Sequence, residues 1–101
     1  MVVDFHSWSI TRGNLSVARE FNRKACAIHE DHDLVLRCRQ WMPLNGKREM
    51  DYAVFEFESL ATMQEYWTWF WQKGSKQLID EWDPGWVVEG SFERYQYQVP
   101  E

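Results

Sequence analysis

Acid–base chemistry is the reaction type that the titratable side chains of this sequence best support. His6 lies two residues before Trp8 in an alternating N-terminal segment, and histidine titrates close to neutral pH. Tyr52 and Glu56 lie in a later alternating segment and bring a hydroxyl and a carboxylate. A histidine beside such groups can move protons to and from a substrate. The sequence therefore predicts His6, Glu56 and Tyr52 as candidate catalytic residues, provided that they share one face of a sheet.

The facing of the first strand decides whether these groups meet. The segment 4–10 alternates as a strand does, with His6 and Trp8 on one side and Phe5 on the other. If His6 and Trp8 point to the uncovered side of the sheet, they join the tyrosine and the carboxylate. The competing interpretation is a hydrogen-bonded structural histidine at a subunit contact. Because Phe5 is itself apolar, the sequence leaves both facings open.

Cationic and aromatic side chains around these groups are the candidate ligand contacts. Two arginines of the same strand would bind an anionic or hydrogen-bonding ligand, or would form ion pairs with neighbouring strands, worth roughly 0.2–1 kcal/mol each. A tryptophan on the outer side of the second helix would line the mouth of a pocket. The predicted ligand-binding residues are Trp8, Arg37, Arg39, Trp41 and Trp69.

Metal and thiol chemistry have weaker support. His29 and His32 flank acidic residues at a helix end, but no further Cys or His follows at a metal-binding spacing. Cys26 and Cys38 form no C-x-x-C pair and read as reduced, buried thiols of a cytoplasmic protein. The sequence also has no glycine-rich phosphate loop. We therefore expect neither a metal nor a cofactor.

The composition of the chain limits the classes of partner that it can bind. The chain has 101 residues, 45% of them hydrophobic, which fits one domain over residues 1–101. Its net charge is −5 and no basic run exceeds two residues, so we expect no nucleic-acid partner. No apolar stretch reaches the length of a membrane span, and the first residues do not resemble a signal peptide. Seven tryptophans exceed what a small core buries and predict an aromatic groove, pocket or interface.

The hydrophobic pattern predicts the order strand, helix, strand, strand, helix, strand. Helical spacing of Val17, Phe21, Ala25 and Ile28 marks the first helix. The predicted elements are a strand over 4–10, a helix over 15–29 capped by Asn14, a hairpin over 34–57, a helix from Ser59 to Gly74 with a short turn after it, and a strand over 86–97.

The hairpin is the clearest local signal. Asn45-Gly46 favours a two-residue type I′ turn, which would fix the register of the flanking strands. The register would pair Cys38 with Ala53, Leu36 with Phe55 and Leu34 with Phe57 on the covered face, and Trp41 with Met50, Arg39 with Tyr52, Arg37 with Val54 and Val35 with Glu56 on the other.

This element order is that of a ferredoxin-like α+β fold. Right-handed crossovers place both helices on one face of a four-stranded antiparallel sheet and leave the other face uncovered. That face would carry apolar side chains at Trp41, Met50, Tyr52, Val54 and Tyr95. Because such a face needs a cover, we expect a homodimer related by two-fold symmetry.

The chain resembles the dimeric α+β barrel superfamily, in particular its NIPSNAP-like and antibiotic-biosynthesis-monooxygenase-like groups. The resemblance rests on the element order, on Arg12-Gly13 before the first helix, and on the stretch 55–60 leading into an aromatic helix. It implies two sheets packed face to face and a ligand cavity in the barrel or under the helices. Members include cofactor-free monooxygenases, isomerases and haem-degrading enzymes. The haem-degrading relatives ligate iron with a histidine of the second helix, and residues 60–82 contain none.

Two functions follow from this resemblance. One is a cofactor-independent monooxygenase or isomerase acting on an aromatic or polycyclic small molecule. The other is a non-enzymatic binding or assembly protein that uses the same dimer. An open cavity with an unpaired His6, Arg37 or Glu56 would favour the enzyme, and a filled, ion-paired interior would favour the binding protein.

Overall fold

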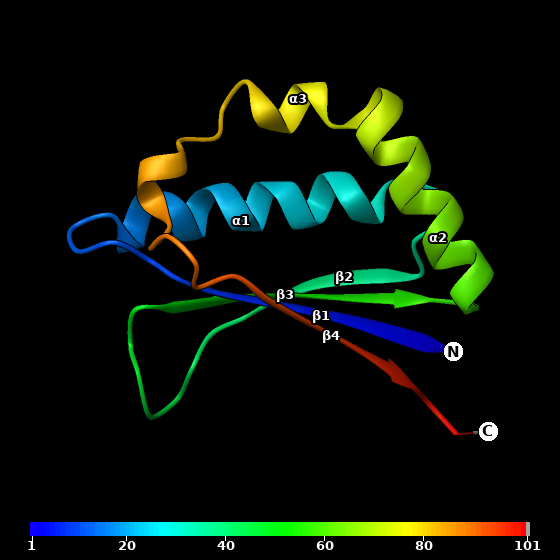
Figure 1. The fold of residues 1–101 in the computed structure, drawn as a ribbon, viewed down its shortest axis with the longest axis horizontal. Helices are drawn as coiled ribbons and strands as arrows, with labels where there is room; N and C mark the ends of the chain where they lie inside the picture. The colour runs from blue at the N-terminus through cyan, green and yellow to red at the C-terminus, as the bar shows by residue number, and fades with distance from the viewer. Residues whose placement is uncertain (101) are drawn as a thin grey trace.

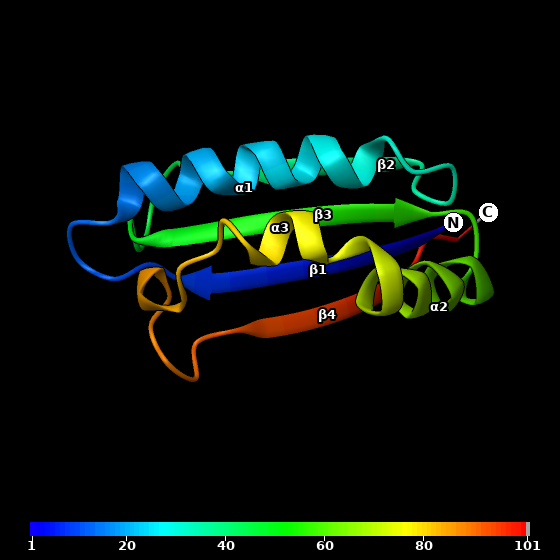
Figure 2. The same ribbon diagram turned by 90° about the horizontal axis from the view of Figure 1, so that it is seen from above.

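The computed structural model describes residues 1–100 and forms two layers, a sheet and a set of helices on one of its faces (Figures 1 and 2). The antiparallel sheet has the strand order β2-β3-β1-β4. This is the predicted ferredoxin-like α+β arrangement. The elements are β1 (Val2–Ser9), α1 (Leu15–Glu30), β2 (Arg37–Trp41), β3 (Met50–Phe57), α2 (Leu60–Trp69), a π-helical turn (Phe70–Gly74), α3 (Lys76–Ile79), a 3-10 turn (Pro84–Trp86) and β4 (Glu93–Gln98).

The register of β1 settles which way its side chains point. His6 lies opposite Ala53 of β3 and Arg94 of β4, on the face covered by the helices. Phe5 lies on the uncovered face, where its ring contacts Trp41 and Tyr52 at centroid distances of 5.9 and 5.5 Å. The side chains of β1 that face the helices are therefore Val2, Asp4, His6 and Trp8.

Helix α1 has the predicted extent, but its buried face is rotated by about one residue. Val17 is 45% exposed, whereas Ala18, Asn22 and Cys26 are buried. Small side chains let the helix approach the sheet closely. Asn22 then anchors it, because its Nδ2 donates hydrogen bonds to Asp51 Oδ1 at 2.9 Å and to the Tyr52 carbonyl at 3.0 Å. Polar anchoring, which a purely apolar pattern ignores, sets the rotation.

The hairpin differs from its prediction. Residues 42–49 form a loop instead of a two-residue turn, and Cys38 pairs with Phe55, two residues from the predicted Ala53. A two-residue shift preserves side-chain parity, so the predicted faces hold for the paired residues 37–41. The tight turn would have placed Pro43, which has no amide proton, inside the ladder. The Arg19 guanidinium also donates to the carbonyl of Arg48 at 2.8 Å and so holds the loop elsewhere.

The predicted second strand is also too long at its start. Residues 34–36 form a turn after α1, in which the Val35 amide donates to the His32 carbonyl at 3.0 Å. Val35 consequently lies in the core rather than on the uncovered face, and Leu36 is 55% exposed rather than buried.

The second half of the chain follows its prediction at the helix and departs from it at the last strand. Ser59 caps α2, since its Oγ accepts from the Thr62 amide at 3.1 Å, and the helical path ends at Gly74. Strand β4 begins at Glu93, seven residues later than predicted. The Asp83 carboxylate accepts from the Gly85 amide at 2.8 Å and stabilises a 3-10 turn over Pro84–Trp86, which ends at the residue where the strand was predicted to begin.

The uncovered face of the sheet carries exposed aromatic rings. Trp41, Tyr95 and Tyr97 are each about half exposed, at 54%, 49% and 54%. The 42–49 loop extends on this side, away from the helices (Figure 1). Within residues 1–100, no helix has the length and apolarity that crossing a membrane requires.

Candidate functional site

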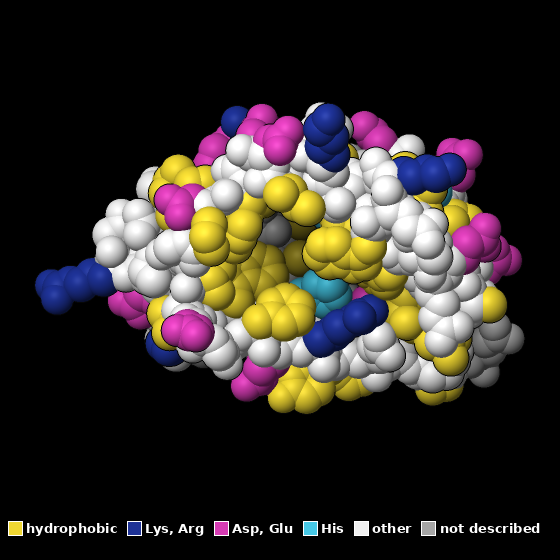
Figure 3. Space-filling model, turned by 45° about the horizontal axis from the view of Figure 1, so that its top comes forward, with side chains coloured by type: hydrophobic (Ala, Val, Ile, Leu, Met, Phe, Trp, Pro, Cys, Tyr) yellow, Lys and Arg dark blue, Asp and Glu magenta, His cyan; other side chains and the backbone are white. Residues whose placement is uncertain are grey.

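A cavity of about 760 Å³ lies between the helix-covered face of the sheet, α1 and the segment from α2 to the 3-10 turn. Figure 3 shows its mouth as a hollow ringed by hydrophobic side chains, with a histidine at the floor. Its walls are mostly apolar, and the aromatic rings that line it include Trp8, Phe55, Trp67, Trp71, Trp82 and Phe92.

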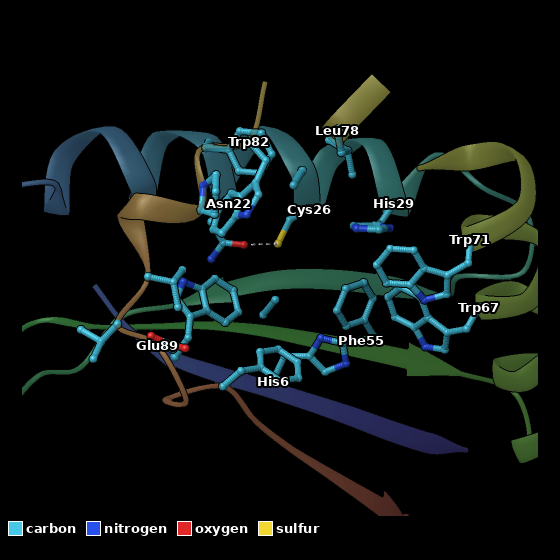
Figure 4. Close-up of a pocket in the computed structure, with 18 of the residues that line it drawn as sticks. His6, Asn22, Cys26, His29, Phe55, Trp67, Trp71, Leu78, Trp82 and Glu89 are labelled. Atoms are coloured by element: carbon cyan, nitrogen blue, oxygen red, sulfur yellow. Dashed lines mark hydrogen bonds between the residues drawn. The ribbon is translucent and has the colours of Figure 1, made fainter. Parts of the chain in front are cut away.

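His6 forms part of the floor of this cavity and points up from β1 (Figure 4). Its ring stacks on Trp67 at a centroid distance of 5.5 Å and contacts Phe55 and Phe92 at 4.9 and 5.4 Å. These contacts hold the imidazole in one orientation. Its Nε2 lies 3.1 Å from Asp4 Oδ1, which is within ion-pair distance, but it forms no hydrogen bond in this geometry.

Asp4 is fully buried beneath the cavity and is held as a carboxylate. Arg94 donates to both of its oxygens, from Nε to Oδ1 at 2.8 Å and from Nη2 to Oδ2 at 2.6 Å. Trp67 Nε1 donates to Oδ2 at 2.9 Å. Burial alone would raise the pKa of Asp4, but His6 and Arg94 outweigh it and lower that pKa to about 2.

The negative charge on Asp4 favours one tautomer of the His6 imidazole. An ionised carboxylate next to Nε2 favours the tautomer in which Nε2 carries the proton. Nδ1 then keeps its lone pair and is the ring nitrogen that can accept a proton from a bound molecule. The arrangement therefore suits a general base.

His29 lines the same cavity from α1 and is 7% exposed. Its Nδ1 is hydrogen-bonded to the hydroxyl of Tyr66 in α2. Burial is the main reason that the pKa of His29 falls to about 4, and the nearby His6 contributes when its ring is protonated. His29 is therefore neutral at pH 7.

The predicted site residues lie on two faces of the sheet. His6 and Trp8 line the cavity. The remaining strand residues, Tyr52, Glu56, Arg37, Arg39 and Trp41, point to the uncovered face. The sheet thus separates His6 from Tyr52 and Glu56, and the three do not form one constellation within a protomer.

The Arg37–Glu56 pair and Trp69 both differ in placement from the prediction. Arg37 and Glu56 share the predicted face, with Nε and Oε2 3.5 Å apart, and they are direct partners, whereas the predicted register placed Val54 opposite Arg37. Trp69 lies away from the cavity mouth and packs on His32 at a centroid distance of 4.2 Å. Trp71 lines the cavity instead, because the π-helical turn changes the phase of the helix.

Sequence reasoning missed Asp4, Arg94, Tyr66 and the cavity role of His29. The sequence does contain an indication for Asp4. It lies two residues before His6 and therefore on the same face of the strand, where a charged residue among apolar ones is unusual. The contribution of Arg94 depends on the pairing of β1 with β4, which no local pattern encodes.

The part of the chain that the structure describes contains no group of three or more His, Cys, Asp or Glu side chains suited to a metal ion.

Comparison with known proteins identifies the fold. No protein-family model matches the sequence, and no curated protein matches it. Among solved structures, a candidate antibiotic biosynthesis monooxygenase from Deinococcus radiodurans aligns with 100% of this chain and 94% of its own, with a TM-score of 0.77 and 17% identity. A second candidate antibiotic biosynthesis monooxygenase, from Nitrosomonas europaea, aligns with 98% of this chain and 98% of its own, with a TM-score of 0.77 and 10% identity. An uncharacterized NIPSNAP domain protein from Burkholderia xenovorans aligns with 100% of this chain and 95% of its own, with a TM-score of 0.68 and 15% identity.

The chain has the fold of these proteins. The match extends over nearly the whole length of each, so the arrangement of the sheet and helices belongs to a shared architecture. At 10–17% identity the likeness concerns the fold, and the side chains of the cavity have to be interpreted on their own chemistry.

Proposed function

We propose that this chain binds a flat aromatic or polycyclic small molecule under its helices and acts on it by proton transfer through His6. The observation that carries the proposal is an open, aromatic-walled cavity whose floor presents a histidine held against a buried carboxylate. Sites for small ligands have this character, being mostly apolar with a few fixed polar groups.

The size and walls of the cavity support the substrate class. A volume of about 760 Å³ lies within the usual range of roughly 300–1,000 Å³ for small-molecule sites. Indole and phenyl walls favour a planar apolar molecule, because offset stacking adds to the hydrophobic effect. Glu89 lies at the margin and gives the rim negative charge.

The proposed chemistry starts with removal of a proton from a carbon atom of the substrate by His6 Nδ1, which leaves the bonding electron pair on the substrate. Return of the proton to another carbon gives an isomer. Reaction of the carbanion with dioxygen gives a hydroperoxide, and loss of water leaves a ketone, with one oxygen atom in each product. The isomerase needs no co-reactant, and the monooxygenase needs only dioxygen. Two of the solved proteins that share the fold are named as candidate monooxygenases, which makes the second outcome worth measuring.

We also propose that a second copy of the chain covers the open face of the sheet. Phe5, Tyr52 and Trp41 form a contiguous aromatic patch there. A two-fold axis would place the same patch of the partner against it. The cavity opens on the other side of the sheet, so the dimer would leave the mouth accessible.

The experiment uses 2-tetralone, a bicyclic aromatic ketone with an acidic C–H, as a probe. Exchange of that hydrogen for deuterium is followed by NMR in the presence of wild-type protein, His6→Gln and, as a matched control, Tyr52→Phe on the opposite face. We expect wild type and the control to accelerate exchange, and His6→Gln to lose roughly 10²-fold. Binding without faster exchange would favour the non-enzymatic binding protein, and absence of binding would refute the proposed site.

A further inference from the structure

The hydroxyl of Tyr66 determines which nitrogen of His29 carries a proton. Tyr66 is 1% exposed, and His29 Nδ1 is the single hydrogen-bond partner of its hydroxyl within residues 1–100. If Nδ1 were the donor, the tyrosine proton would be buried with no acceptor, which is costly. The tyrosine therefore donates and Nδ1 accepts. The proton of the neutral imidazole must then reside on Nε2.

His29 and His6 approach the cavity from opposite layers. His29 descends from α1 and His6 rises from β1, as Figure 4 shows. Both rings contact Phe55, at centroid distances of 5.0 and 4.9 Å, and both contact Trp67, at 5.7 and 5.5 Å. A proton acceptor, His6 Nδ1, and a proton-bearing nitrogen, His29 Nε2, thus belong to rings that border the same apolar wall of one cavity.

From this geometry we infer that His29 is a second catalytic residue, whose Nε2–H donates a hydrogen bond to the oxygen of an arene-fused ketone while His6 removes a proton from the adjacent carbon. The inference rests on the proposed function and narrows its substrate class. A hydrocarbon would satisfy the aromatic walls and leave Nε2–H without an acceptor. A ketone with an acidic C–H satisfies both histidines at once.

The proton and electron balance of the step is simple. His6 Nδ1 takes the proton from carbon and becomes imidazolium next to the Asp4 carboxylate. The electron pair of the C–H bond forms the C=C bond of an enolate, and the C=O π electrons move to oxygen. His29 stays neutral and donates to that oxyanion. A preorganised donor in an apolar-walled site stabilises such a charge strongly.

The protonation states of the two partners agree with this role. Burial keeps the pKa of His29 near 4, so the ring does not become a competing cation at neutral pH. Burial also raises the pKa of the Tyr66 hydroxyl above its ordinary value, so the hydroxyl keeps its proton and continues to donate to Nδ1.

A binding experiment tests the inference without relying on turnover. The probe is 2-naphthol, whose phenolate mimics the enolate and absorbs at longer wavelength than the phenol. The apparent pKa of the bound probe is measured by absorbance for wild type, His29→Phe, His29→Gln and Tyr66→Phe. His32→Gln serves as the control, because His32 lies three residues away and does not line the cavity.

We expect His29→Phe to raise the pKa of the bound probe by about one unit, a tenfold loss of phenolate. His29→Gln, which keeps an N–H donor, should recover part of the difference. Tyr66→Phe removes the hydrogen bond that fixes the tautomer of His29, so it should raise the pKa of the bound probe by a smaller amount. The control His32→Gln should leave that pKa unchanged. An unchanged probe pKa in both His29→Phe and His29→Gln would overturn the inference. Loss of deuterium exchange in His6→Gln alongside that result would leave the proposed function standing, whereas failure of wild type to bind the probe would refute both.

Discussion

Asp4 connects the stability of the fold to the orientation of His6. Its folded-state pKa of about 2 lies below the ordinary 3.8, so the unfolded chain binds the proton more tightly. This stabilisation is fully present above pH 3.8 and is lost as the pH falls through 2. The shift corresponds to about 2.5 kcal/mol at neutral pH.

The first prediction compares wild type with Asp4→Asn in urea unfolding at pH 6 and pH 3. Asparagine cannot ionise, so the stability advantage of wild type should shrink by about 1 kcal/mol between the two pH values. An advantage that stays constant would show that the carboxylate is not the charged partner of Arg94 and His6.

His29 adds a second loss of stability at acid pH, in a higher pH range than that of Asp4. Its pKa of about 4 lies below the ordinary 6.5, so the unfolded chain takes up a proton between these values and the folded chain does not. The free energy of unfolding should therefore fall by about 3 kcal/mol as the pH drops from 7 to 4. Wild type should lose this amount relative to His29→Gln, which does not titrate. Parallel pH profiles for the two proteins would contradict the buried, neutral state of His29.

Among the elements, the π-helical turn after α2 depends on Gly74. A Cβ at this position would lie 2.5 Å from the ring of Trp69. We expect Gly74→Ala to reduce stability by about 1–3 kcal/mol, because the indole has to leave its contact with His32. Lys73→Ala in the same turn is the matched exposed control. If the two variants unfold at the same urea concentration, the packing of Trp69 on the turn is not what stabilises it.

The elements also show how far sequence reasoning extends. The order of strands and helices could be predicted because each element carries its own periodicity or cap, as Ser59 does for α2. The hairpin register could not, because the preference of Asn45-Gly46 competes with Pro43 and with the hydrogen bond from Arg19 on α1. A local turn preference does not determine the register when a distant element forms hydrogen bonds with the same loop.

The candidate site shows the same limit. His6 and Trp8 could be chosen by residue type, but their side of the sheet depends on how β1 pairs with its neighbours. Tyr52 and Glu56 lie on the uncovered side of β3, and the cavity lies on its other side. The partnership of Asp4 with Arg94 joins residues 90 positions apart and follows from the fold alone.

At the scale of the whole molecule, we predict a two-fold dimer through the uncovered face. Trp41 is 54% exposed on that face, and Leu60 is 50% exposed on α2. Sedimentation at tens of micromolar should show a dimer for wild type and for Leu60→Glu, and a monomer for Trp41→Glu. An interface of this kind should bury more than about 1,000 Å². Monomeric wild-type protein would remove the basis for a covered face.

The central claim is that the ligand lies under the helices between His6 and His29. The chain has three histidines, so their Cε1–H proton NMR signals can be followed individually during a titration with 2-naphthol. We expect the signals of His6 and His29 to shift with ligand concentration while that of His32 does not move. If His6 and His29 keep their positions while the ring protons of Tyr52 shift, the ligand occupies the uncovered face and does not lie between the two histidines.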